Sequence, residues 1–447
     1  MRVIVIGLGD VGQHIARTLS RERHDVTIVD VDADRVEAMQ GELDALLVAG
    51  DGASPAFLRR LGVGDADLLC GVTQSDPVNV IAALVARQLG ARQTVARVRD
   101  SHYFGDDPSF ARDQLGIDFV INPERATAED LAEAILLPGA VHVEYFADGK
   151  VAVAESILTH RSPLVGQPIG SRRVVRPSLV IGLIRDGRAL AAEAGHRPKI
   201  GDHVLVAAAR EHIEPVVAHV AGHASRVRDV IVFGGGRIGT RLATILERTA
   251  MRVTILEREA ERARRVAEQL GGALVLHEEG LSRDALLQSG VGDADAFIAS
   301  AGDDRANLLA ALNAKRLGAD LCMSVVSREE FVPLVDALEI DAAFSPRLIT
   351  AEAILRFVHT RALRAMHFLR TGFEALELEV EEGALIVGRE LGRTGGMLSG
   401  CRVGAILRGD DVLIPHVGSE LNAGDRVLML GVDGTLADVE PVFTARS

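Results

Sequence analysis

The chain has 447 residues, 48% of them hydrophobic and 25% charged, an ordinary composition for a globular protein of roughly three domains. Its 63 acidic and 49 basic residues give a net charge of −14, which disfavours binding to nucleic acid or anionic lipid through bulk charge. No run of 18 apolar residues is present, and Met1 leads almost directly into the first predicted strand, so we expect neither a membrane span nor a signal peptide. The cysteines Cys70, Cys322 and Cys401 form no CxxC pair and are expected to be reduced thiols in a cytoplasmic protein.

The first 30 residues carry a dinucleotide-binding pattern. An apolar run at 3–6 predicts a buried strand, followed by Gly7-Leu8-Gly9-Asp10-Val11-Gly12, a helix, and a second strand that ends in Asp30. Gly7 permits a tight turn, Gly9 lets the backbone approach a pyrophosphate, and Gly12 lets the helix pack closely on the strand. The N–H groups at the helix start would bind phosphates. Asp30 would accept hydrogen bonds from both ribose hydroxyls and repel a 2′-phosphate, which favours NAD-type or adenine nucleotides over NADP.

Beyond Asp30, strands and helices alternate, which predicts an open parallel sheet with a nucleotide at its carboxyl edge. The predicted strands cover 45–49, 68–73, 94–99 and 119–121, and the predicted helices cover 33–40, 55–61, 76–90 and 126–137. Four residues follow strands at that edge and are candidates for ligand contact: Asp51, Thr73, Gln74 and Arg97. Asp51 also fits a simple turn role, and Arg97 also fits an ion pair with a neighbouring acid.

The same pattern returns 227 residues later. An apolar strand leads into Gly234-Gly235-Gly236-Arg237-Ile238-Gly239, a helix, and a strand that ends in Glu257. The run Gly290–Asp295 repeats Gly62–Asp67 at an offset of 228, so one residue is inserted between the motifs. Chance does not produce such spacing, and the sequence therefore predicts an internal duplication.

Each duplicated unit is followed by a segment with a different sequence pattern. Both contain short apolar runs separated by Gly, Pro and Asp, with hairpin signals at Arg185-Asp186-Gly187 and Arg408–Asp411. We predict an α/β protein with two Rossmann-like parallel-sheet domains at 1–139 and 225–368, each followed by a small α+β module, at 140–224 and 369–447. A predicted helix at 348–368 has an apolar stripe that is typical of core or a subunit contact: Ile354, Leu355, Val358, Ala362, Met366 and Leu369.

The chemistry of an oxidoreductase is not apparent in the sequence. There is no Tyr-x-x-x-Lys pair, no nucleophile elbow and no histidine cluster with metal spacing, so we predict neither a catalytic nor a metal site. The two predicted nucleotide sites are not equivalent. From the first half to the second, Asp10 becomes Arg237, Thr73 becomes Ala301, and the turn Gly50-Asp51-Gly52 becomes His277-Glu278-Glu279. We therefore expect NAD(H) at the first site and ATP or ADP, or weak binding, at the second.

The duplicated glycine loop, the acid-ended second strand, the run Val-Ala-Arg97-Val-Arg99 and the paired small modules resemble the Trk-type potassium-uptake regulatory family, TrkA, built of tandem RCK (KTN) domains. The resemblance covers essentially the whole chain. It implies a cytoplasmic, peripheral subunit on the inner face of the cell membrane that binds NAD(H) and adenine nucleotides. It also implies a homo-oligomeric ring, a dimer or tetramer, that regulates a potassium-translocating membrane subunit. The nucleotide contacts it implies are Gly7, Leu8, Gly9, Asp10, Val11, Gly12, Asp30, Asp51, Thr73, Gln74 and Arg97, and then Gly234, Gly235, Gly236, Arg237, Ile238, Gly239, Glu257, Glu278 and Ser300.

Two other functions stay open on the sequence alone. A tandem-Rossmann NAD-dependent oxidoreductase would require a catalytic acid or base in the cleft. A nucleotide-sensing regulator of a different ion transporter would carry the same motifs, because the partner surface has no motif of its own.

Overall fold

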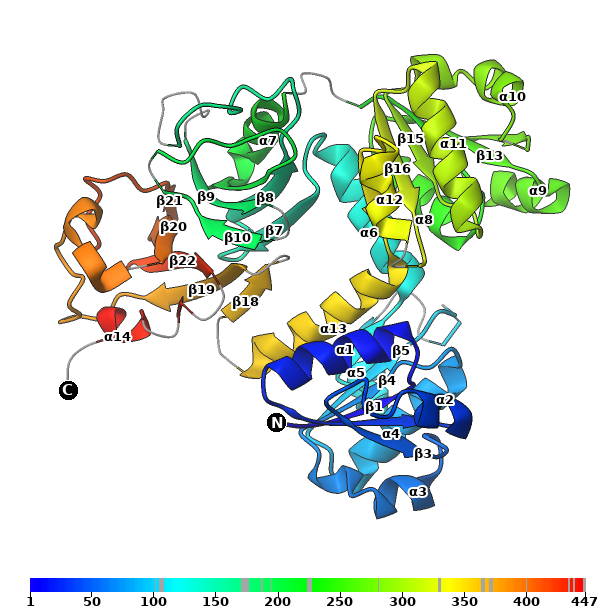
Figure 1. Cartoon of the computed structure of the whole chain (residues 1–447), viewed down its shortest axis with the longest axis horizontal. Helices are drawn as coiled ribbons and strands as arrows, with labels where there is room; N and C mark the ends of the chain where they lie inside the picture. Colours follow the sequence, from blue (N-terminus) through cyan, green and yellow to red (C-terminus); the bar gives the residue numbers. More distant parts are fainter. Residues whose placement is uncertain are drawn as a thin grey trace. The chain divides into compact units, whose positions relative to one another are not determined.

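The computed structural model describes residues 1–447 apart from 101, 104–107, 170–176, 186–187, 194, 223–226, 280, 329–330, 363–365, 370–372, 399, 433–434, 437–438 and 445–447. The described chain folds into two compact units (Figure 1). One unit combines residues 1–131 with 229–358 and holds both glycine loops. The other combines 132–228 with 359–447 and holds both small modules.

The first glycine loop belongs to a parallel sheet whose described strands run in the order β3-β2-β1-β4-β5-β6. Its strands are β1 (Arg2–Ile6), β2 (Asp25–Asp30), β3 (Leu46–Ala49), β4 (Leu68–Gly71), β5 (Gln93–Arg97) and β6 (Phe119–Ile121). Its helices are α1 (Asp10–Arg21), α2 (Ala33–Ala38), α3 (Pro55–Arg60), α4 (Asp76–Leu89), α5 (Pro108–Leu115) and α6 (Pro123–Leu136). The order reverses direction between β1 and β4, so the loop after β1 lies at the switch point where such sheets bind ligands.

The second copy repeats this topology in the order β14-β13-β12-β15-β16-β17. Its strands are β12 (Asp229–Phe233), β13 (Arg252–Glu257), β14 (Leu274–His277), β15 (Ala296–Ala299), β16 (Leu321–Val325) and β17 (Ala342–Phe344). Its helices are α8 (Arg237–Leu246), α9 (Ala260–Gln269), α10 (Arg283–Gln288), α11 (Asp304–Leu317), α12 (Val332–Ala337) and α13 (Pro346–Ala362). The predicted doubly wound, duplicated α/β architecture is thus confirmed.

The core of the first sheet follows from the sequence pattern. Strand β1 is apolar at almost every position because helices cover both faces of a parallel sheet. On α1, Val11, Ile15 and Leu19 recur every four residues and are buried against it, which is the face expected of an amphipathic helix.

Helix α13 comes from the second copy but packs into the core of the first. Ile354, Leu355 and Val358 belong to the same buried cluster as the apolar face of α1, and the Phe357 ring stacks on Phe119 with centroids 4.9 Å apart. Figure 1 shows α13, in yellow, lying along α1. The predicted core or contact role is confirmed for these three residues.

The predicted extension of this helix to residue 368 is wrong. The described helix ends at Ala362, and Met366–Leu369 form strand β18, which pairs antiparallel with β19. The side chain of Ala362 lies outside the described residues. The apolar residues of the helix and those of the following strand are close in sequence, so together they resemble the apolar stripe of a single helix.

The second unit contains two small antiparallel sheets, as predicted for the modules. The first has the order β10-β9-β11-β8-β7, made of β7 (His142–Phe146), β8 (Val151–Ile157), β9 (Ser178–Arg185), β10 (Arg188–Ala191) and β11 (His203–Ala209), with helix α7 (Ile213–Ala221). The second has the order β18-β19-β22-β20-β21, made of β18, β19 (Phe373–Glu379), β20 (Cys401–Arg408), β21 (Asp411–Leu413) and β22 (Arg426–Val432), with helix α14 (Glu440–Phe443). The hairpin at Arg408–Asp411 is confirmed, and Arg185 pairs with Arg188 across the other turn, whose residues 186–187 are not described.

The two modules share one apolar cluster within this unit. It combines Phe146 and Leu205 of the first module with Phe373 and Leu428 of the second. The packing is close, because a Cβ built on Gly182 would lie 2.3 Å from the Phe373 ring. None of the described helices is both long and apolar enough to cross a membrane.

Candidate nucleotide-binding sites

The first glycine loop has the geometry that its three glycines require. Gly7 has φ +116°, a conformation that side-chain-bearing residues rarely adopt. A Cβ on Gly12 would lie 1.9 Å from the Gly7 carbonyl oxygen, so only glycine allows α1 to approach the loop this closely. A Cβ on Gly9 would meet no atom within 4 Å. The backbone at Gly9 is therefore open on the side where a phosphate would approach.

The start of α1 offers hydrogen-bond donors to a ligand. Gly9 is its N-cap residue, and no described side chain accepts a hydrogen bond from the first turn. Unpaired N–H groups at a helix start, together with the positive end of the helix dipole, bind anions well. The loop thus fits the phosphates of a nucleotide, as its sequence predicts.

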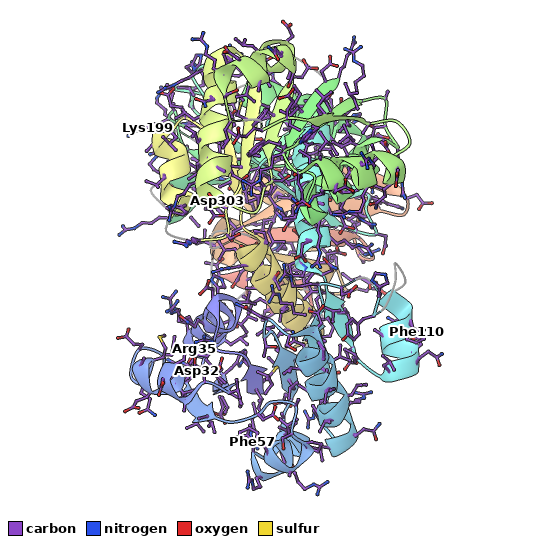
Figure 2. The ribbon with its side chains drawn as sticks, turned by 90° about the vertical axis from the view of Figure 1, so that its right-hand side faces the viewer. Asp32, Arg35, Phe57, Phe110, Lys199 and Asp303 are labelled. Carbon is purple, nitrogen blue, oxygen red and sulfur yellow. The ribbon has the colours of Figure 1, made fainter. Side chains whose placement is uncertain are left out.

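Asp30 anchors the loop. Its carboxylate is 8% exposed and accepts hydrogen bonds from the backbone N–H of Leu8, at 2.7 Å, and of Asp32, at 3.0 Å. Arg35, on α2, lies 3.5 Å from it, and Figure 2 shows Asp32 and Arg35 close together. Each carboxylate oxygen can accept a further hydrogen bond, so the geometry leaves room for the ribose hydroxyls. Contact between Asp30 and a ribose stays a prediction. What the sequence missed is that this acid also holds the glycine loop in place.

Asn79 is a second residue of the site that the sequence patterns did not indicate. Its side chain is fully buried and accepts hydrogen bonds from Thr73 N, at 2.8 Å, and Thr73 Oγ1, at 2.7 Å. Its Nδ2 donates to the Thr73 carbonyl, at 3.0 Å, and the Arg97 carbonyl, at 2.8 Å. Asn79 therefore joins the ends of β4 and β5, where two predicted ligand residues lie.

Arg97 is the most distinctive cation near this loop. Its Nη1 donates to the Thr73 carbonyl at 3.1 Å, while its buried Nε has no hydrogen-bond partner among the described residues. Burial, reinforced by the nearby Arg99, lowers the pKa of Arg97. A buried donor without a partner costs free energy, and an anionic ligand would supply the acceptor. The other two predicted contact residues are exposed. Gln74 follows Thr73 in the chain, and Asp51 accepts a hydrogen bond from Ala53 N in a turn.

The second glycine loop reproduces the first closely. Gly234 has φ +103°, a Cβ on Gly239 would lie 2.0 Å from the Gly234 carbonyl oxygen, and a Cβ on Gly236 would meet no atom within 4 Å. Glu257 is 2% exposed and accepts hydrogen bonds from Gly235 N, at 2.9 Å, and from Glu259 N, at 2.8 Å. The backbone framework of both loops is therefore equivalent.

The surroundings of the second loop differ in ways that matter for anions. Strand pairing makes Val325 the counterpart of Arg97, so the partly buried cation of the first site is missing at that position. Ala301 replaces Thr73, and Asn307 still holds its backbone through hydrogen bonds at 2.8 and 2.9 Å. The hydroxyl of Ser300 donates to the loop carbonyls of Phe233 and Gly234.

The alignment of His277-Glu278-Glu279 with Gly50-Asp51-Gly52 is wrong by one residue. Ala49 pairs with Asp30, and His277 pairs with Glu257, so His277 corresponds to Ala49. The inserted residue thus precedes β14. Glu278 replaces Gly50, and Glu279 is the counterpart of Asp51. A ligand contact of Glu278 stays a prediction, but its stated equivalence to Asp51 does not hold.

Other candidate chemistry is sparse in the described part of the chain. It contains no group of three or more His, Cys, Asp or Glu side chains that could hold a metal ion. All three cysteines are free and buried, and burial raises the pKa of Cys322 to about 12 and that of Cys70 further. The thiols of Cys70 and Cys322 are therefore protonated core groups rather than nucleophiles.

Two glycine loops at the switch points of two parallel sheets, each tied to a buried acid, define a protein with tandem Rossmann-type domains. Family models agree: the TrkA-N domain matches residues 3–123 and 230–346, and the TrkA-C domain matches residues 375–444. The Trk system potassium uptake protein TrkA of Halomonas elongata is 35% identical over 452 residues, covering 99% of this chain and 98% of that protein. The TrkA protein of Azorhizobium caulinodans is 34% identical with the same coverage. The chain belongs to the TrkA family of Trk system potassium uptake proteins, which confirms the resemblance seen in the sequence.

Solved structures share the fold at lower identity. The crystal structure of the GsuK RCK domain is 20% identical with a TM-score of 0.65, covering all of this chain and 95% of that one. The structure named the GsuK channel bound to NAD gives the same identity and TM-score, covering all of this chain and 79% of that one. At this identity the comparison establishes the fold of tandem RCK domains.

Proposed function

We propose that this chain is the nucleotide-sensing regulatory subunit of a Trk-type potassium uptake system. Family membership supports the link to potassium uptake. Sensing of NAD(H) and of ATP or ADP is supported by the glycine loops and by related folds whose structures are named as bound to NAD and to ADP. In this proposal the chain is peripheral on the inner face of the cell membrane and gates a separate translocating subunit.

The observation that carries the proposal is the open backbone at Gly9 and Gly236. At both loops the helix start lacks a side-chain cap, and a Cβ would project into space free of protein atoms. The loop N–H groups would hold the phosphates, Arg97 would supply a cation at the first site, and Asp30 and Glu257 would keep the loops in shape while facing the ribose. We assign NAD(H) to the first site and ATP or ADP, or weak binding, to the second.

Regulation by these sites requires that a ligand prefer one state of the assembly. A tenfold preference supplies about 1.4 kcal/mol, so several sites acting together are needed for a decisive switch. Two loops per chain, multiplied in a homo-oligomeric ring of RCK domains, would give that number of sites.

The test uses Gly9→Ala and Gly236→Ala in the full chain. Both glycines have ordinary backbone angles, φ −80° and −73°, and an added methyl meets no protein atom, so both variants should fold like the wild type. Each methyl would occupy the approach to one phosphate site. Calorimetric titration with NADH, NAD, ATP and ADP should show one class of sites weakened at least about tenfold in each variant. Unchanged binding in both, or no binding of any adenine nucleotide to the wild type, would overturn the proposal.

The partner and the reaction are tested separately. The tagged chain should co-purify with a potassium-translocating membrane subunit, and potassium flux through that complex should respond to NADH, ATP or ADP. Co-purification with a different ion transporter would favour the alternative regulator. Consumption of NADH with any member of a substrate panel would instead indicate an oxidoreductase.

A further inference from the structure

Among the described residues, two ion pairs join the duplicated halves of the first unit, and both lie at glycine loops. Arg347, at the start of α13, pairs with Asp10, the first residue of α1. Arg237, the first residue of α8, lies 3.9 Å from Glu124 at the start of α6, measured from Nη1 to Oε1. In each pair, one residue belongs to a loop and the other to the helix that follows the sixth strand of the opposite half.

The two pairs occupy equivalent positions with exchanged charges. Asp10 and Arg237 are the first residues of equivalent helices, and Glu124 and Arg347 are the second residues of equivalent helices. The first half thus presents an acid in its loop and an acid on its helix. The second half presents a base at both positions.

Local helix energetics do not account for the two arginines. The start of a helix carries a partial positive charge, which favours Asp10 and Glu124 but disfavours Arg237 and Arg347. Within its own half, Glu124 also accepts a hydrogen bond from Arg99 at 2.7 Å. In the second half, the uncharged Ser327 stands at the position equivalent to Arg99. The reversal extends to a third position, where Asp100 corresponds to Arg328. A hydrogen bond from the backbone N–H of His102 is the main cause that lowers the pKa of Asp100, and the positive charge of Arg237 also lowers it.

Most of the apolar packing is alike in the two halves, although Phe357 of α13 stacks on Phe119, whose counterpart in the second half is Ala342. Leu131 and Ile135 on α6 and Ile354 and Val358 on α13 occupy equivalent helix positions, and all four are buried. Similar apolar helices could pack on either kind of half, so discrimination needs an element that repels the wrong partner.

We propose that Asp10, Glu124, Arg237 and Arg347 form a pairing code that joins a first Rossmann half to a second one, within the chain or in another copy, and disfavours pairing of like halves. Two first halves would place Asp10 against Glu124, and two second halves would place Arg237 against Arg347. Only the mixed pair satisfies both contacts.

The test exchanges charges without changing the net charge of the four positions. The double variant Glu124→Arg/Arg347→Glu makes mixed pairs repulsive and like pairs attractive. The quadruple variant Asp10→Arg/Glu124→Arg/Arg237→Asp/Arg347→Glu restores attraction in the mixed pair and is the matched control. All variants are made in the full chain.

The readout is a single tryptophan, Phe357→Trp, in a chain that has no other. This position stacks on Phe119, whose counterpart in the second half is Ala342, so a like pair or a released helix changes its environment. At low ionic strength the double variant should show altered tryptophan emission and sedimentation, with the mixed pair disfavoured on the order of tenfold, and added salt should reduce the difference. The quadruple variant should match the wild-type background.

The outcomes separate cleanly. A double variant that loses helical circular dichroism beside a folded quadruple variant also supports the code, because both contain the same residue types. A double variant with wild-type emission and sedimentation overturns it. So does a quadruple variant as perturbed as the double one, which would mean that these side chains act individually, for instance on phosphates.

Discussion

Replacing Asn79 with leucine tests the connection between the fold and the first nucleotide site. The fully buried side chain hydrogen-bonds two backbone groups of Thr73 and the carbonyl of Arg97. Leucine has the same number and branching of side-chain heavy atoms but no polar atom. Leaving a buried backbone group without a partner costs about 1–3 kcal/mol. The Thr73 carbonyl keeps its bond from Arg97, so two groups lose their partner and we expect a loss of about 2–6 kcal/mol.

Hydrogen exchange measured by mass spectrometry is the suitable assay, because it reports each half of the protein separately. Peptides that cover the ends of β4 and β5 should exchange at least about 25-fold faster in Asn79→Leu, since 1.4 kcal/mol corresponds to a factor of ten. Affinity for nucleotide at the first site should also fall, because the ends of β4 and β5 position Thr73 and Arg97.

Asn307→Leu is the matched control. Asn307 is equally buried and bonds Ala301 and Val325 in the same way, at 2.8 to 2.9 Å. It should accelerate exchange in the second half at least as much, because Val325 stands in place of Arg97 and gives the Ala301 carbonyl no such second bond, while leaving the first site unchanged. If Asn79→Leu leaves exchange at β4 and β5 unaltered, or if Asn307→Leu alone abolishes binding at the first site, the reasoning is refuted.

Three further predictions concern single contacts. Gly12→Ala should destabilise the protein by at least about 3 kcal/mol in chemical denaturation, because its methyl would collide with a loop carbonyl 1.9 Å away. Gly182→Val should lower the melting temperature by displacing the facing phenylalanine ring 2.3 Å away, whereas Gly271→Ala, with open space around it and no left-handed backbone angle, should cost less. Burial raises the pKa of Asp202, but hydrogen bonds from Arg185 and from a backbone N–H outweigh it and lower the pKa overall. Its stabilising effect is therefore complete above the unfolded pKa, about 3.9, and is lost as the pH falls through the folded value, so Arg185→Leu should make acid unfolding begin at a higher pH.

The sequence predicted the architecture because its signals are local. Glycine spacing, an acid at the end of the second strand and the alternation of strands with helices repeat at a nearly constant offset. The duplication could also have identified Asn79, since Asp76 and Asn79 recur as Asp304 and Asn307. Its role was missed because a buried asparagine and a helix-start asparagine look alike without the backbone groups around them.

The errors came from features that depend on neighbours in space. The position of the inserted residue could not be fixed from two glycine loops, and strand pairing places it before β14, which moves Glu278 to the position of Gly50. The end of α13 was misjudged because Met366–Leu369 are as apolar as the helix but pair with β19. The sequence could not indicate the ion-pair partners of Asp10 and Arg237, because each partner lies in the opposite half.

The duplicated halves are alike where a buried backbone dictates the residue and differ where a ligand or the other half would be met. Glycines at tight approaches avoid collisions that a side chain would cause, and the asparagines at the strand ends hydrogen-bond buried backbone groups, so a change there destabilises the fold. Val325 stands in place of Arg97 and Arg237 in place of Asp10, and these differences change the charge near each loop. A common framework with different charge at each opening is what two sites with different nucleotide preferences require. The partly buried cation at the first opening, with a donor that lacks an acceptor, makes that site the stronger candidate for a tightly bound anionic ligand.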